Sequence, residues 1–125
     1  MMITGGVVSN NTASAEGGGL WNGSGTMTIV DVMITGNTAS GASADQGGGG
    51  VFNAGGTVDI SGSTTISNNN ADGAAGSGGG ILNDAGGDLT INSATISCNT
   101  AVCAGGGIED NSTASIYIDI NIRID

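Results

Sequence analysis

The stretch Gly17–Asn22, GGGLWN, places the only tryptophan of the chain behind three glycines and one leucine. The same arrangement recurs as GGGVFN (Gly48–Asn53), GGGILN (Gly78–Asn83) and GGGIED (Gly105–Asp110). The residue after the third glycine is always aliphatic, at positions 20, 51, 81 and 108, which lie 31, 30 and 27 residues apart. A period in this range is typical of stacked repeat architectures, in which each repeat packs only against its neighbours.

Each repeat contains two further strand-like pieces. One alternates apolar and polar residues, which predicts a half-buried strand: TMTI (26–29), TVDI (57–60) and DLTI (88–91). The other begins with an aliphatic residue and has an asparagine three places on: VSNNTA (8–13), ITGNTA (34–39), ISNNNA (66–71) and ISCNTA (96–101). Three short strands per repeat, with glycine and asparagine at the corners, predict one coil of a parallel β-helix.

We therefore expect an all-β, right-handed parallel β-helix of about four coils, with handedness taken from the general rule for parallel crossovers. Like residues stack on like residues at about 4.8 Å in such a fold. Four inward ladders are predicted: Met1/Met27/Val58/Leu89, Ile3/Ile29/Ile60/Ile91, Val8/Ile34/Ile66/Ile96 and Leu20/Val51/Ile81/Ile108. A turn ladder of stacked amides is also predicted: Asn11, Asn37, Asn69 and Asn99. The glycine triplets are expected at sharp turns where a Cβ would clash.

Composition and charge exclude several classes of partner. One basic residue, Arg123, stands against 11 acidic ones, which gives a net charge of −10. Because Lys and Arg dominate affinity for phosphates, nucleic acids are excluded as partners, and anionic membrane surfaces are disfavoured. No stretch is long and apolar enough to span a membrane, so direct membrane insertion by this segment is not expected. The acidic, lysine-free, Asn- and Thr-rich composition suits an extracellular protein.

The repeats occupy residues 1–110, and the pattern changes in residues 111–125. There SIYIDINIRID alternates isoleucine with other residues, which predicts a terminal strand or a departure from the repeat. Between the third piece and the next glycines lie loops of unequal length, SAE, SGASADQ, DGAAGS and VCA, all expected on one side of the rod. Because solenoids need caps and neither end supplies one, we expect the chain to be a fragment of a larger protein, able to self-associate end to end.

The four GGG[ILV] motifs, paired with VSNN, ITGN, ISNN and ISCN, resemble the repeats of polymorphic outer-membrane proteins and related bacterial autotransporter-like β-helix passengers. That family pairs a Gly-Gly-Ala-Ile type motif with Phe-x-x-Asn, and here an aliphatic residue replaces the phenylalanine. The resemblance covers about residues 1–110. It implies a secreted, surface-exposed stalk or adhesin of a bacterial cell, and it carries over no catalytic residue, because the family motifs are structural.

Two groups of residues are candidates for ligand binding. Trp21, Phe52 and Leu82 follow the inward aliphatic residue, so they are expected to form an outward column. This column either binds an apolar or sugar surface or is covered by the loops. Because exposed apolar patches are selected against, we favour burial of the column by the loops. Hydroxyl columns that contain Thr35 and Thr38 suggest ice binding by fold-level analogy, although ordinary strand propensity explains them as well.

Polysaccharide binding or cleavage is the main alternative to a stalk, because many parallel β-helices act on polysaccharides. Cleavage needs clustered carboxylates and basic groups, yet Asp31 and Asp59 share no column with other acids, and the chain has no histidine or lysine. We therefore assign no catalytic residue, no cofactor and no metal ligand. Asp45, Asp72, Asp84 and Asp88 could supply oxygen ligands to calcium, but their scattered positions are better explained by solvated surface acids.

Cys98 and Cys103 lie five residues apart. The sequence leaves open a local disulfide between them or two free thiols. The leading functional hypothesis is a non-enzymatic structural or adhesive segment of a secreted bacterial surface protein, with glycans or host surface proteins as partners.

Overall fold

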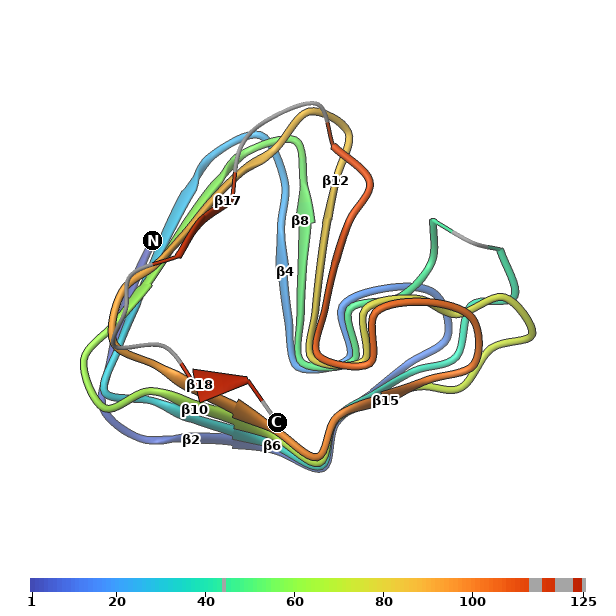
Figure 1. Cartoon of the computed structure of the whole chain (residues 1–125), viewed down its shortest axis with the longest axis horizontal. Helices are drawn as coiled ribbons and strands as arrows, with labels where there is room; N and C mark the ends of the chain where they lie inside the picture. The colour runs from blue at the N-terminus through green and yellow to red at the C-terminus, as the bar shows by residue number, and fades with distance from the viewer. Residues whose placement is uncertain (44, 113–115, 119–122, 125) are drawn as a thin grey trace.

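The chain is an all-β solenoid. The computed structural model describes residues 1–43 and 45–112, together with the backbone of residues 116–118 and 123–124. The described residues contain strands and turns and no helix. All strand pairs are parallel, and each strand pairs with its equivalent in the next coil. The predicted parallel β-helix of about four coils is therefore confirmed (Figure 1).

The strands form four sheets, which we call A to D. Sheet A contains β1 (Met2–Thr4), β5 (Thr26–Val30), β9 (Thr57–Ser61), β13 (Asp88–Ile91) and β17 (Ile116–Ile118). Sheet B contains β2 (Val7–Ser9), β6 (Met33–Thr35), β10 (Thr65–Ser67), β14 (Thr95–Ser97) and β18 (Arg123–Ile124). Sheet C contains β3 (Thr12–Ala13), β7 (Thr38–Ala39), β11 (Asn70–Ala71) and β15 (Thr100–Ala101). Sheet D contains β4 (Leu20–Asn22), β8 (Val51–Ala54), β12 (Ile81–Asp84) and β16 (Ile108–Asp110).

Each complete coil thus has four strands rather than the three expected. The piece that the sequence presents as one unit, such as ISNNNA, divides between sheets B and C. The backbone turns there through a left-handed residue, with φ between +54° and +68° at Asn10, Gly36, Asn68 and Cys98. Because asparagine tolerates this conformation better than most residues, the corner can recur in coil after coil.

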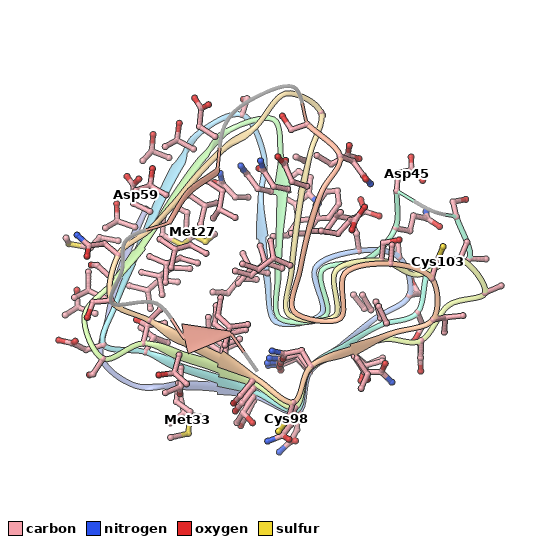
Figure 2. The ribbon with its side chains drawn as sticks, in the orientation of Figure 1. Met27, Met33, Asp45, Asp59, Cys98 and Cys103 are labelled. Carbon is pink, nitrogen blue, oxygen red and sulfur yellow. The ribbon has the colours of Figure 1, made fainter. Side chains whose placement is uncertain are left out.

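Sheets A, B and D surround the hydrophobic core (Figure 1). The predicted ladders through Ile29, Ile34 and Val51 run in register along these sheets. Figure 2 shows Met27 pointing into this core, while Met33 points away from it. Met1, the predicted first rung of the Met27 ladder, is exposed. A full burial contributes about 1.5–3 kcal/mol for each large aliphatic side chain, so the ladders are the main source of stability.

A fifth inward column was not predicted. Val32, Thr64 and Ala94 are buried between sheets A and B. The Thr64 hydroxyl accepts a hydrogen bond from the Val32 N–H at 3.2 Å and donates one to the Ser61 carbonyl at 2.7 Å. The extra residue of the third coil, in which the spacing between apolar anchors is six rather than five, therefore lies in the turn just before Thr64.

The chain between sheet C and the glycine triplets forms a side lobe, which comprises residues 14–16, 40–43, 45–46, 72–77 and 102–104 of the described chain. Figure 1 shows that the loops of the second and third coils extend farthest from the core. All four loops of unequal length lie in this lobe, as expected. The lobe is itself stacked, since the Ser40 and Gly41 N–H groups donate to the Ala13 and Ala15 carbonyls.

The described parts of the tail belong to two sheets. β17 pairs with β13 in sheet A, whereas β18 pairs with β14 in sheet B. Both strands are parallel to their partners, so the described parts of residues 111–125 continue the solenoid on two of its sheets. The isoleucine side chains of the tail lie outside the described residues.

Candidate functional site

The glycine triplets form the neck between the side lobe and sheet D. Their N–H groups donate to the carbonyls of the next triplet, for example Gly18 to Gly48 at 3.1 Å and Gly19 to Gly49 at 3.0 Å. A Cβ on Gly18 would lie 2.5 Å from the carbonyl oxygens of Gly49 and Thr38. The neck therefore brings backbone from sheet C and the triplet so close together that no side chain fits between them.

The first glycine of each triplet explains the position of the tryptophan. Gly17 has φ of +69°, and a Cβ there would lie 2.9 Å from the Cβ of Trp21. Gly78 repeats this arrangement with φ of +65° and a distance of 2.8 Å to the Cβ of Leu82. Trp21 is thus one rung of an outward column on sheet D, and the first glycine makes the left-handed turn beneath it.

The structure buries most of this predicted ligand column. Phe52 is 4% exposed and Leu82 is 0% exposed, so neither side chain can contact a ligand. Trp21 is 52% exposed. In the fourth coil the column ends in Glu109, which pairs in register with Leu82. The column is therefore largely a packing feature, with one exposed aromatic ring on β4.

The two hydroxyl columns lie on the outer faces of sheets B and C. Thr35 is partly exposed and accepts a hydrogen bond from the Ser67 hydroxyl at 3.4 Å. Thr38 is partly exposed on sheet C, where it pairs in register with Asn70. The predicted candidates Thr35 and Thr38 therefore belong to different sheets, joined at the left-handed corner, and do not share one flat surface.

The predicted asparagine ladder is present and continuous. The Asn37 side-chain oxygen accepts from both the N–H and the amide of Asn11, each at 3.0 Å. Asn69 accepts in the same way from Asn37 at 2.9 and 3.0 Å, and Asn99 from Asn69 at 2.9 and 3.0 Å. Every link has the same direction, with the earlier coil donating. Asn37 and Asn69 are fully buried beside the third glycine of the triplets.

A second buried ladder runs through sheet D, and sequence analysis missed it. The Asn22 amide donates to Asn53 at 2.9 Å, and Asn53 donates to Asn83 at 2.8 Å. Asn83 then donates to the Asp110 carboxylate at 3.0 Å. Each of the three asparagines also donates to a backbone carbonyl in the turn that follows its strand. The signal was visible in the last letter of GGGLWN, GGGVFN, GGGILN and GGGIED.

The acidic residues of the described chain are dispersed over several surfaces. Asp31 sits at a left-handed corner and accepts hydrogen bonds from the Ser63 N–H at 2.8 Å and hydroxyl at 3.1 Å. Figure 2 places Asp59 on the outside of sheet A and Asp45 on the side lobe. In the described part of the chain, no three Asp, Glu or Cys side chains gather closely enough to hold a metal ion, and no pocket opens.

Both cysteines are free and exposed. Figure 2 places Cys98 at the corner between sheets B and C and Cys103 on the side lobe. Of the two states that the sequence leaves open, the structure contains the free thiols. Cys98 occupies a left-handed corner with φ of +54°, where its equivalents are asparagine and glycine.

No protein-family model, curated protein or solved structure matches this chain. Within the described residues, no helix is long and apolar enough to cross a membrane.

Proposed function

We propose that the chain is a non-enzymatic structural and adhesive segment of a secreted bacterial surface protein. One observation carries this proposal: the residues that recur in every coil join that coil to the next. The glycine triplets bond to each other, the aliphatic residues fill the core, and the asparagines form two ladders. A repeat whose recurring residues all serve stacking is suited to extending a rod.

The location at a bacterial surface is supported by sequence rather than by geometry. The paired GGG[ILV] and [IV]xxN motifs resemble the repeats of bacterial autotransporter-like passengers. The net charge of −10 keeps such a rod soluble and discourages nonspecific association with other anionic surfaces. The side lobe collects the loops of unequal length, so it is the surface on which copies of the repeat differ and on which we place contacts with glycans or host proteins.

Attachment of the producing cells tests the proposal. Antibodies against the purified chain should label intact cells, with a cytosolic protein as the unlabelled control. A strain that lacks the gene should attach less to host cells or surfaces. Complementation with an Asn70→Ala variant should restore attachment, whereas Asn69→Ala, which breaks the buried ladder, should restore it poorly.

Two outcomes would overturn the proposal. One is labelling that appears only after the cells are permeabilised, since a surface rod must be accessible from outside. The other is release of oligosaccharides from pectin, alginate or a neutral polysaccharide by the purified chain, because a structural segment cleaves nothing. Denatured protein serves as the control for contaminating activity in the second assay.

A further inference from the structure

The outer face of sheet B carries a regular array of small hydroxyl side chains, which we call the hydroxyl face. Its members on strands β2, β6, β10 and β14 are Ser9, Thr35, Thr65, Ser67, Thr95 and Ser97. All six are partly exposed. Val7 and Met33 complete the array with exposed apolar side chains.

The array repeats in two directions. Thr65 pairs with Thr95 and Ser67 with Ser97, with no bulge between the strands. Ser67 also pairs with Thr35, which pairs with Ser9. Neighbouring strands lie about 4.8 Å apart, and alternate residues along a strand about 6.6 Å apart. Six of the eight outward positions on these strands thus carry a hydroxyl, at spacings of the same order as those between oxygen atoms on the prism faces of ice.

The four strands of the hydroxyl face carry no charged residue, and one charged residue adjoins them: Arg123 of β18, which pairs in register with Thr95. The acidic side chains of the described residues lie on the side lobe, on sheets A and D, and at corners: Glu16, Asp31, Asp45, Asp59, Asp72, Asp84, Asp88, Glu109 and Asp110. None lies on β2, β6, β10 or β14. Charged groups orient nearby water strongly around themselves, whereas hydroxyls can both donate and accept within a water network and methyl groups order the water beside them.

The core beneath this face is rigid. The inward residue of each of the last three strands, Ile34, Ile66 and Ile96, is fully buried. The asparagine ladder holds the corner at the end of the same strands. Figure 1 shows β2, β6 and β10 following nearly the same path where they approach that corner. The backbone positions that carry the hydroxyls are therefore held in place by the core and by the asparagine ladder.

We propose that the hydroxyl face binds ice. The ligand is a lattice of ordered water, held by hydroxyls at matching repeats and by the apolar groups between them. A neutral polysaccharide is less well suited, because sugar rings stack on aromatic side chains, and the described aromatic side chains, Trp21 and Phe52, lie on sheet D. This inference concerns one lateral face and does not depend on the proposed location at a cell surface.

A matched pair of lysine variants tests the proposal. Thr65→Lys places a long charged side chain in the hydroxyl face, and Thr57→Lys places the same side chain on sheet A of the same coil. Both threonines are partly exposed, so the two variants differ mainly in the face that they alter. Thermal melts of both variants establish that each one is folded before ice binding is measured.

We expect the unaltered chain to hold ice crystals without growth below their melting point and to partition into slowly grown ice. Thr57→Lys should behave like the unaltered chain, and Thr65→Lys should lose most of both effects. Absence of both effects in the unaltered chain would overturn the proposal, as would equal loss in the two variants. Binding to insoluble cellulose or chitin that Thr65→Lys abolishes, without any effect on ice, would instead assign this face to a neutral glycan.

Discussion

At the scale of single residues, asparagine supplies the side-chain hydrogen bonds that join successive coils in both ladders. A primary amide offers an acceptor and two donors on a short planar group, so it can accept from one coil and donate to the next. The buried Asn69 uses this capacity fully, since it accepts twice from Asn37 and donates to Asn99 and to the Ile34 carbonyl. Stacked amides polarise one another, which strengthens each bond in the ladder.

Replacing Asn69 with alanine should lower the free energy of unfolding by about 3 kcal/mol, because each buried polar group left without a partner costs about 1–3 kcal/mol. The Asn37 N–H and the Asn37 side-chain amide both lose the acceptor that Asn69 provides. Urea unfolding, monitored by circular dichroism, measures the change.

Asn70→Ala is the matched control, since Asn70 is partly exposed and accepts only from the Thr100 hydroxyl. Its effect should stay within about 0.5 kcal/mol, as for most surface substitutions. Equal effects of the two substitutions would show that the ladder contributes nothing beyond ordinary surface contacts.

The first ladder could be predicted from sequence because its asparagines stand at one fixed distance from an aliphatic residue. The second could not be recognised so easily. Asn22, Asn53 and Asn83 end the most apolar strand of each repeat, where alternation alone assigns an inward residue to the hydrophobic core. The turn carbonyls that satisfy these amides, such as Gly56 and Gly87, become their partners only when the coil closes.

At the scale of elements, the strands contain only two to five residues, so each depends on pairing with its neighbours in the sheet. The glycine neck is what allows four such strands to form a closed coil with a lobe. A Cβ on Gly50 would lie 2.6 Å from the Gly80 carbonyl and 3.1 Å from the Asn69 amide nitrogen. The neck therefore requires glycine at these positions, just as the core requires large aliphatic side chains.

Gly50→Ala should destabilise the fold by about 1–3 kcal/mol, because the neighbouring backbone must shift to admit the methyl group. Gly25→Ala provides the comparison, since a Cβ there meets no atom within 4 Å. That control should be neutral or stabilise by about 0.4–1 kcal/mol through lower entropy of the unfolded chain. Thermal melts of both variants give the answer, and a Gly50→Ala variant as stable as Gly25→Ala would contradict the close approach.

The number of sheets was harder to predict than their existence. The hydrophobic period and the register of the repeats were sufficient to predict sheets A, B and D, because each strand of these sheets has an inward aliphatic residue. Sheet C is led by Thr12, Thr38, Asn70 and Thr100 and has only alanine on its inner side. With no large apolar residue to mark it, the strand merges in the sequence with the piece before it.

At the scale of the whole molecule, the acidic residues shape stability as well as solubility. With 11 acidic residues and one arginine, the folded chain concentrates negative charge that the unfolded chain can spread out. Asp59 and Asp88 are diagonal neighbours on β9 and β13, because Asp59 pairs with Thr90 and Asp88 with Thr57. Repulsion of this kind acts against the compact state.

Added salt should therefore raise the midpoint of thermal unfolding, because it screens the repulsion between the carboxylates. The Debye length falls from about 30 Å at ~0.01 M to about 10 Å at ~0.1 M ionic strength. Melting curves in a sodium chloride series test this expectation. The double variant Asp59→Asn with Asp88→Asn should show a higher midpoint at low salt and a weaker response to added salt. A midpoint that falls with salt would mean that attraction, not repulsion, governs the surface.

The one-way direction of the asparagine ladders also bears on how genes for such rods can change. In both ladders, each asparagine that lies between two coils accepts from the coil before it and donates to the coil after it, so coils of this kind can follow one another in any order. The fourth coil differs in the second ladder, where Asp110 replaces the asparagine. Loss of residues 38–69 by recombination between repeats would place Asn37 beside Asn99 and Ile34 beside Ile96, with donors still facing acceptors. Unequal crossing-over would thus lengthen or shorten the protein by whole coils of about 4.8 Å. Heritable variation in the length of the rod would then arise without any change of fold.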